Sequence, residues 1–328
     1  MPHWARTRCS SAVLATSFWI AGPARGELRA AALGALAPGH VRVKTRYSGI
    51  SRGTERLVWN GRVPPAEYER MRAPFQDGAF PYPVKYGYCA VGRIVEGPRA
   101  GARVFALHPH QDLFDVPDAM ALPIPDGVPD EAAPLAAHME TAVNALWDHP
   151  VRVGDRVAVV GLGAVGLCVA QLAARVPGVD LVAIDPAPAA RARAHAAGLR
   201  VAEAAEGCDL VFHASGTAAG LAAAIAAAGF EATIVELSWY GEGTVAAPLG
   251  GAFHAKRLTL AASQVGAVSP SRRATRDHLG RLALALALLA EPSLRPDLGP
   301  ALAFADLPAR YAEALDAHPS PLPLVAYD

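Results

Sequence analysis

Hydrophobic and polar residues alternate in the first third of the chain. Residues 41–47 follow this pattern, and residues 90–95 and 101–106 form two further short apolar runs. Because successive side chains of a strand point to opposite faces, such alternation predicts half-buried strands. Glycine and proline separate the runs. The pattern therefore predicts a compact β-rich domain in this part of the chain.

From about residue 130 onward, helical and strand-like segments alternate. Residues 130–148 carry acidic residues first and then apolar residues at helical spacing. A strand, a glycine-rich turn and a helix follow within residues 151–176, and further apolar runs lie at 181–185, 209–215 and 231–238. This order predicts an α/β fold with a doubly wound parallel sheet of the Rossmann type.

The last part of the chain contains helical segments after residue 270 and at residues 305–318, and a short strand within 321–328. We predict two domains. The first spans residues 1–130, with residues 271–328 returning to it in part, and the dinucleotide-binding domain spans residues 131–270.

Two segments resemble membrane or targeting signals. The run LALALALL at 282–289 has about half of the roughly 20 residues that cross a bilayer. Arg6 and Arg8 precede SSAVLATSFWIAGPA, which has the charged start and apolar middle of a signal peptide. The alternative is an opening strand, which we favour because HVRVKTRYSGI at 40–50 continues a β pattern. We expect a cytoplasmic protein with no membrane partner.

The composition excludes several classes of protein. Of the 328 residues, 52% are hydrophobic and 18% are charged, so a large core can form. Basic and acidic residues balance at 30 each, which gives no electrostatic reason to expect a nucleic-acid partner. The four cysteines form no CxxC pair, so neither a disulfide framework nor a structural zinc site is indicated.

A glycine motif, Gly161-x-Gly163-x-x-Gly166, follows an apolar strand and opens a helix. Gly161 permits a tight turn, Gly163 lets the backbone approach a pyrophosphate, and Gly166 lets the helix pack closely on the strand. The amides of Ala164 and Val165, with that of Gly166, would face the phosphates at the helix N-terminus. The alternative is a glycine-rich turn with a purely structural role. We favour a dinucleotide site.

Asp185 ends the next strand, 19 residues after Gly166, and can accept hydrogen bonds from the two hydroxyls of an adenosine ribose. It could also be an ordinary turn residue before Pro186. Arg191 and Arg193 could bind the 2′-phosphate of NADP, but the carboxylate would repel that phosphate. We therefore predict NAD as the cofactor, with NADP less favoured.

Four motifs resemble the medium-chain dehydrogenase/reductase (alcohol dehydrogenase-like) superfamily over nearly the whole chain. They are YSGISRGTE at 47–55, YGYCAVGRIVE at 86–96, PLAAHMETA at 134–142 and FHAKRLTLAAS at 253–263. The pattern IS-x-GTE is most similar to a zinc-lacking branch that includes bacteriochlorophyllide (hydroxyethyl) dehydrogenase-like proteins. The resemblance implies a GroES-like substrate domain, a Rossmann domain, hydride transfer between them, and cofactor contacts from Thr141 and Ser215. It also implies a homodimer, with residues 259–265 as the pairing edge strand.

The departures from that superfamily lie at its catalytic zinc ligands. Ser51 replaces the cysteine, Tyr88 replaces the histidine, and Ala137 occupies the third ligand position. These side chains do not form a zinc site of nitrogen, sulfur and carboxylate ligands. The segment after Phe105 also lacks the cysteine-rich structural zinc lobe. We predict no metal, and the pair His108 and His110 lacks a third ligand in sequence.

Without zinc, hydroxyl and imidazole groups must orient the substrate oxygen and move its proton. The predicted catalytic residues are Ser51, Thr54, Tyr88 and His138, and His138 could shuttle a proton near neutral pH. Each has a structural alternative, since His138 could be a hydrogen-bonded helix residue and Tyr88 could fill the metal's volume. Glu55 and Glu140 lie in the same motifs, and for Glu55 we favour a structural role.

Three functions remain open. We favour a zinc-independent, NAD-dependent oxidoreductase that acts on a small-molecule secondary alcohol or its ketone. A reductase of activated double bonds or quinones, often dependent on NADPH, is the second. A non-catalytic dinucleotide-binding protein is the third. The sequence does not identify the substrate.

Overall fold

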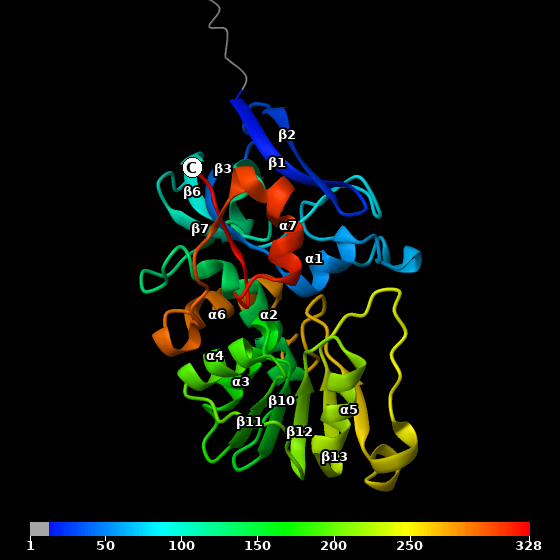
Figure 1. The fold of residues 1–328 in the computed structure, drawn as a ribbon. Coiled ribbons are helices and arrows are strands. Elements are labelled where there is room, and N and C mark those ends of the chain that lie inside the picture. The colour runs from blue at the N-terminus through cyan, green and yellow to red at the C-terminus, as the bar shows by residue number, and fades with distance from the viewer. Residues whose placement is uncertain (1–12) are drawn as a thin grey trace, which may run out of the picture.

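The computed structural model describes residues 13–328 as an upper β-rich unit and a lower unit built on a parallel sheet (Figure 1). The basic residues Arg6 and Arg8 lie outside the described residues. The apolar run that follows them forms β1 (Val13–Gly22), as the strand interpretation predicted. No helix within residues 13–328 is both long and apolar enough to cross a bilayer.

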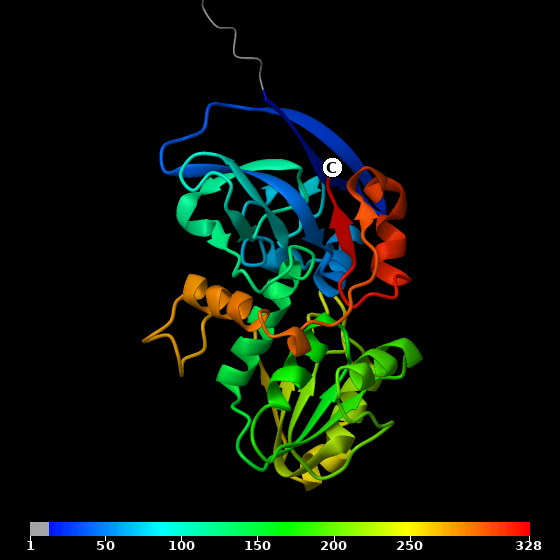
Figure 2. The same ribbon diagram turned by 90° about the vertical axis from the view of Figure 1, so that its left-hand side faces the viewer.

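The larger β-rich sheet has the strand order β15-β16-β3-β6-β7-β9, and β8 also pairs with β3. Its members are β3 (His40–Gly49), β6 (Ala90–Glu96), β7 (Arg103–Ala106), β8 (Leu113–Pro117), β9 (Leu122–Pro123), β15 (Leu302–Ala303) and β16 (Leu324–Ala326). The first three were predicted from their alternation. The C-terminal strand β16 pairs with β3, so the last residues of the chain complete the sheet that begins near the N-terminus (Figure 2).

A smaller sheet of the same unit has the order β2-β1-β5-β4. Its further strands are β2 (Arg25–Leu33), β4 (Asp77–Gly78) and β5 (Val84–Lys85). Helices α1 (Arg52–Trp59) and α7 (Leu307–Asp316) lie beside it. Buried aromatic residues from this region, including Phe18 and Tyr311, form a core cluster of the β-rich unit.

The lower unit is a parallel sheet with the order β11-β10-β12-β13-β14. Its strands are β10 (Arg156–Val160), β11 (Asp180–Ile184), β12 (Cys208–His213), β13 (Ala228–Glu236) and β14 (Thr259–Ala262), and its helices are α3 (Ala164–Ala173), α4 (Pro188–Ala196) and α5 (Ala218–Ala227). The predicted α/β fold is confirmed. On its outer side, β11 forms only one isolated parallel bridge, between Ala183 and Val201.

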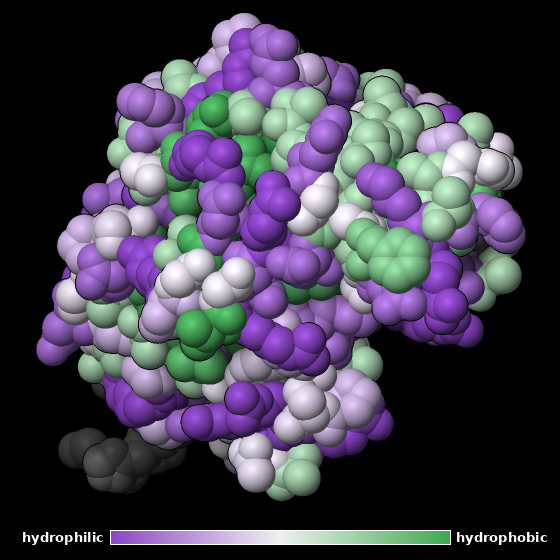
Figure 3. All heavy atoms as spheres, turned by 90° about the horizontal axis from the view of Figure 1, so that it is seen from below, coloured by the Kyte–Doolittle hydropathy of each residue, from purple (hydrophilic) through white to green (hydrophobic). Residues whose placement is uncertain are grey.

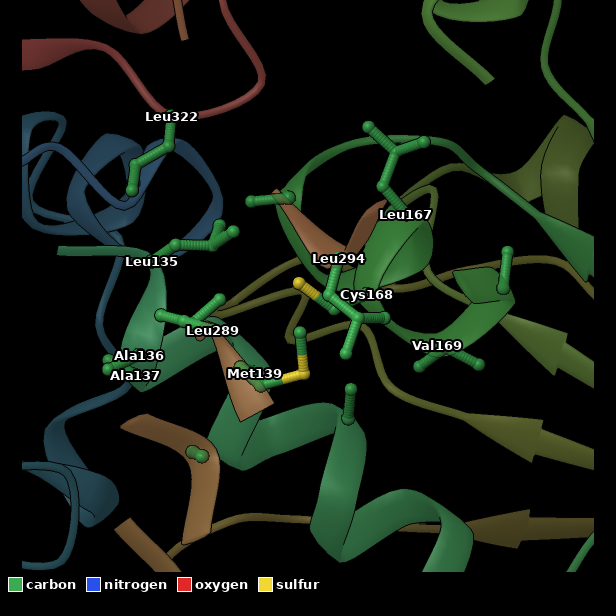
Figure 4. Packing of buried hydrophobic residues seen from close by; sticks show 14 of the residues in the cluster. Leu135, Ala136, Ala137, Met139, Leu167, Cys168, Val169, Leu289, Leu294 and Leu322 are labelled. Atoms are coloured by element: carbon green, nitrogen blue, oxygen red, sulfur yellow. The ribbon is translucent and has the colours of Figure 1, made fainter. Parts of the chain in front are cut away.

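One cluster of buried hydrophobic residues contains members of both units. Helix α2 (Ala136–Asp148) packs against α3 and against α6 (His278–Leu288). Figure 4 shows Met139 of α2 and Cys168 of α3 in this cluster, together with Leu322 from the C-terminal segment. The helix predicted at 130–148 starts at Ala136, because a 3₁₀ turn containing Pro134 precedes it. Seen from below, apolar and polar residues are intermixed over the lower face (Figure 3).

Candidate active site

The glycine motif lies at the point where the order of the parallel strands reverses. From β10 the chain runs outward to β11 and then returns to β12 on the other side of β10. In open α/β sheets, ligands bind outside the carboxyl ends of the strands at such a switch point. The turn 161–163 occupies this place, between β10 and the N-terminus of α3.

The three glycines differ in what surrounds them. A Cβ on Gly161 would lie 2.6 Å from the backbone nitrogen of Ser215, and a Cβ on Gly166 would lie 1.8 Å from the Gly161 carbonyl oxygen. Both positions exclude side chains for reasons of packing. A Cβ on Gly163 would meet nothing within 4 Å. The open side of Gly163 fits the close approach of a pyrophosphate that was predicted for this residue.

Helix α3 begins directly after Gly163, so its first backbone amides lie at the glycine turn. Gly163 is the N-cap residue, and no side chain caps the helix there. The amides of Ala164, Val165 and Gly166 have no partner within the helix, because an α-helix leaves its first N–H groups unpaired. These amides and the helix dipole fit a bound phosphate.

Asp185 lies just after β11 and points back to the glycine turn. Its Oδ2 accepts a hydrogen bond from the Leu162 amide at 2.8 Å, and its Oδ1 accepts one from the Ala187 amide at 2.8 Å. Arg191 donates to the carbonyl oxygens of Asp185 and Pro186, and Arg193 donates to the Pro319 carbonyl. Both arginines therefore already bind backbone oxygens. By contrast, the Asp185 carboxylate is hydrogen-bonded to the glycine turn through the Leu162 amide.

The two remaining predicted cofactor residues lie on different elements. Thr141, on α2, donates a hydrogen bond to the Ala137 carbonyl at 3.0 Å. Ser215 lies two residues beyond β12 and packs against Gly161. Ser215 thus lies at the dinucleotide turn, whereas the Thr141 hydroxyl is engaged with its own helix.

The predicted catalytic residues come together in the β-rich unit and at the start of α2. Tyr88 donates a hydrogen bond from its hydroxyl to Ser51 Oγ at 2.5 Å, and His138 Nε2 lies 3.0 Å from the same oxygen. Thr54 lies in α1, three residues after Ser51. Ser51 and His138 are buried. We call Ser51, Tyr88 and His138 the hydroxyl–imidazole cluster.

Burial sets the protonation states in this cluster. It lowers the pKa of His138 to about 4, so the imidazole is neutral at neutral pH. Burial also raises the pKa of Tyr88, and its contacts with Ser51 and Thr54 oppose that shift only in part. This pKa lies below the neutral range in which His138 was expected to shuttle a proton. A neutral His138 can still accept a proton from Ser51 at Nε2, while its buried Nδ1 has no hydrogen-bond partner in the structure.

The donor set does not fit a catalytic zinc ion. Ser51 Oγ and the Tyr88 phenol are already hydrogen-bonded to each other, and Ala137 has no ligating atom. Zinc sites require several imidazole, thiolate or carboxylate ligands, and the cluster contains one imidazole. Across residues 13–328, no three His, Cys, Asp or Glu side chains gather as a metal site.

A second polar network lies behind Ser51. Glu55 is fully buried and accepts a hydrogen bond from the Ser51 amide at 2.6 Å, while its other oxygen contacts His110 Nε2 at 3.0 Å and the Tyr311 hydroxyl. His110 Nδ1 in turn lies 2.7 Å from Ser48 Oγ. These contacts agree with the structural role predicted for Glu55. Its partners are a backbone amide, a histidine and a tyrosine. Nothing in the sequence pairs residue 55 with residue 311.

Two other motif residues are engaged elsewhere. Glu140 forms a buried ion pair with Arg281 of α6 at 3.0 Å. His108 stacks on Phe114 with ring centroids 3.8 Å apart, and burial lowers its pKa to about 3. Neither side chain belongs to the hydroxyl–imidazole cluster.

Comparison with known proteins agrees with this architecture. No protein-family model matches the chain. A 2-desacetyl-2-hydroxyethyl bacteriochlorophyllide A dehydrogenase from Cereibacter sphaeroides is 36% identical over 112 residues. That alignment covers 32% of this chain and 30% of the relative, so the similarity spans less than a third of the relative's length.

Solved structures resemble the chain over nearly its full length. A protein from Sinorhizobium meliloti, described as a zinc-binding dehydrogenase and bound to NADP, is 17% identical with a TM-score of 0.76, and the alignment covers 96% of this chain and 99% of that one. The chain has the fold of these dehydrogenases. The 2R,3R-butanediol dehydrogenase of Bacillus subtilis is 16% identical with a TM-score of 0.73, covering 96% and 100% of the two chains.

Proposed function

We propose that this chain is a zinc-independent, NAD-dependent oxidoreductase that transfers hydride between nicotinamide and a secondary alcohol or its ketone. The observation that carries the proposal is the hydroxyl–imidazole cluster. Its Ser51 and Tyr88 stand at two positions where the family resemblance places zinc ligands, and His138 follows the third, Ala137. A likeness in fold to a butanediol dehydrogenase, whose substrate is a secondary alcohol, supports the substrate class.

The chain's own groups would orient the substrate oxygen and remove its proton. When bound, the nicotinamide supplies or accepts the hydride. Tyr88 and Ser51 offer hydroxyls that can hydrogen-bond the substrate oxygen. Ser51 can pass a proton to the neutral imidazole of His138 through the 3.0 Å contact with Nε2. The proton would then leave the substrate without a Lewis acid.

We propose NAD over NADP because Asp185 is fixed at the carboxyl end of β11 by two backbone amides. A carboxylate there accepts the 2′- and 3′-hydroxyls of the adenosine ribose and repels a 2′-phosphate. The arginines that could bind that phosphate already donate to carbonyl oxygens.

The test combines an activity screen with metal analysis. Purified protein is assayed with NAD and NADH, and with NADP and NADPH, against alcohols, ketones, enones and quinones by nicotinamide absorbance. We expect turnover of secondary alcohols or ketones with NAD(H), unaffected by chelator and without stoichiometric zinc. Turnover of enones or quinones alone would assign a double-bond reductase. Binding of NADH without any turnover would assign a non-catalytic protein.

We further propose a cytoplasmic homodimer that pairs through β14. This strand lies at one edge of the parallel sheet, and its Leu260 is 41% exposed. Exposed strand edges pair readily with a symmetry mate. The described cysteines Cys89, Cys168 and Cys208 are buried free thiols, as expected in a reducing compartment.

Light scattering at micromolar concentration should give about twice the chain mass of 34.1 kDa. Leu260→Lys should shift the distribution towards the monomer, because it places a charge at the edge. A wild-type protein that remains monomeric would refute the pairing.

A further inference from the structure

We infer that the buried carboxylate of Glu55, held by His110 and Tyr311, is the counter-charge for the proton that His138 accepts during turnover. Glu55 is then a positioning residue, because it acts on the imidazole through its charge. The inference rests on the proposed function and adds an electrostatic role to the hydrogen bonds of Glu55. It also gives a role to His110, which the proposed proton path does not use.

A protonated His138 is a buried cation. The imidazole is 5% exposed, and its Nδ1 has no hydrogen-bond partner among residues 13–328. A proton taken up at Nε2 therefore places a positive charge in a buried site, which is unfavourable unless an opposite charge lies near. Glu140, two residues further along α2, already forms an ion pair with Arg281. Its charge is neutralised by that arginine.

Glu55 and His138 contact the same residue. The Ser51 amide donates to Glu55 Oε1 at 2.6 Å, and Ser51 Oγ lies 3.0 Å from His138 Nε2. One residue thus separates the carboxylate from the nitrogen that accepts the proton. Burial, the larger effect, lowers the pKa of His138, and the charge of Glu55 raises it. The carboxylate therefore favours the protonated imidazole.

The surroundings of Glu55 supply no permanent positive charge. Its side chain is fully buried, and among residues 13–328 no arginine or lysine forms an ion pair with it. Besides His110 and His138, five titratable side chains interact with its charge: Tyr86, Tyr88, Cys89, Tyr311 and Tyr327. Burial raises the pKa of each of the five, so all are uncharged at neutral pH. A proton on His138 supplies the missing positive charge.

Three hydrogen-bond donors favour the ionised form of Glu55. Oε1 binds the Ser51 amide, and Oε2 binds the Tyr311 hydroxyl and His110 Nε2, the latter at 3.0 Å. Hydrogen bonds to a carboxylate stabilise its charged form. Tyr311 belongs to α7, which lies beside α1 (Figure 1). The carboxylate is thus held by parts of the chain that are far apart in sequence.

His110 can donate to Glu55 without carrying a charge. Its Nδ1 lies 2.7 Å from Ser48 Oγ, which lies 2.9 Å from the Tyr327 hydroxyl. When Tyr327 donates to Ser48 and Ser48 donates to Nδ1, the imidazole proton is on Nε2 and points at Glu55. A second proton on His110 would add another buried charge, which burial disfavours. Glu55 and His110 together therefore keep one negative charge.

The test is a double-mutant cycle that combines Glu55→Gln with His138→Gln. Glu55→Gln keeps the shape of the side chain and removes its charge. We expect it to lower kcat by about tenfold in the wild-type background, because the imidazole becomes a weaker base. In the His138→Gln background no imidazole takes the proton, so the same change should alter kcat by less than about twofold. Rates are measured with the secondary alcohol that is oxidised fastest in the activity screen.

Glu55→Asp separates charge from shape. It keeps the charge and shortens the side chain, so it should retain more activity than Glu55→Gln. Should Glu55→Gln fail to fold, Glu55→Asp replaces it in the cycle, because the shorter side chain moves the charge away from Ser51. Its smaller loss of kcat should also vanish in the His138→Gln background.

Glu140→Gln is the matched control, since it removes the other buried carboxylate near His138. It should lower the melting temperature, because Arg281 loses its partner, and should leave kcat within about threefold of the wild type. An equal loss of kcat from Glu55→Gln in both backgrounds would overturn the inference, because a purely structural carboxylate gives that result. A Glu55→Asp variant slower than Glu55→Gln would overturn it as well. A wild-type protein that oxidises no alcohol would instead overturn the proposed function.

Discussion

Replacing Ser51 by alanine should lower kcat by about 10²-fold or more while NADH binds as tightly as in the wild type. Ser51 Oγ is the one atom that contacts both Tyr88 and His138, so the change interrupts every proposed path between substrate oxygen and imidazole. Tyr88→Phe removes only one of the two contacts and should have a smaller effect of the same kind. Steady-state rates with the best alcohol of the screen, and NADH titration by fluorescence, measure the two quantities.

Tyr82→Phe is the matched control for the tyrosine change. The Tyr82 hydroxyl donates to the Trp59 carbonyl at 2.9 Å and contacts neither Ser51 nor His138. Its loss should leave kcat within about twofold, because a lone neutral hydrogen bond contributes little to overall structure. Full activity in Ser51→Ala would show that the cluster has no part in turnover, and a double-bond reductase would become the better assignment.

The pH profile follows from the neutral state of His138. Because burial lowers its pKa to about 4, the imidazole stays unprotonated from about pH 6 upward and can accept a proton throughout that range. The rate should show no inflection from His138 near neutrality and should fall only as the pH drops towards 4. An inflection near pH 6.5 that disappears in His138→Gln would contradict this assignment.

Gly163→Ala should reduce NADH affinity by at least about tenfold without changing the melting temperature, because the methyl group occupies the side that the pyrophosphate approaches. Gly163 has φ −69° and ψ −170°, which alanine adopts freely, and its Cβ would meet no atom of the chain within 4 Å. The protein should therefore fold normally. Differential scanning fluorimetry and NADH titration give the two readings.

Gly250→Ala provides the control, since a Cβ there also meets nothing within 4 Å and the residue lies away from the turn. It should change neither stability nor affinity. If Gly163→Ala binds NADH as tightly as the wild type, the glycine turn does not hold the pyrophosphate.

Local sequence patterns were sufficient for the parallel sheet and its turn. The apolar runs became β10 to β13 because short buried strands bounded by turns carry their own signal. The separate roles of Gly161 and Gly166 were also predictable, since both depend on contacts between neighbouring segments of one strand–turn–helix unit. Residues 25–33 carry no clear alternation, so β2 was missed.

The buried polar groups have partners that lie far away in the sequence, and no local pattern predicts such pairs. Ser51 meets Tyr88 and His138, 37 and 87 residues away, and Glu55 meets Tyr311, 256 residues away. The resemblance named the members of the hydroxyl–imidazole cluster, but burial decided that His138 is neutral. His213 meets Glu236, 23 residues away, because parallel pairing of β12 with β13 places the two residues opposite each other.

The sequence by itself determined the parallel sheet and the glycine turn, because each is encoded in residues close along the chain. The family resemblance named the hydroxyl and imidazole groups, which lie far apart in the sequence. Only the tertiary structure decided which groups hydrogen-bond, which are neutral, and how the C-terminal strand completes the N-terminal sheet. The physical reason is that a buried polar side chain must find a partner, and the packing of distant elements determines which partners are within reach.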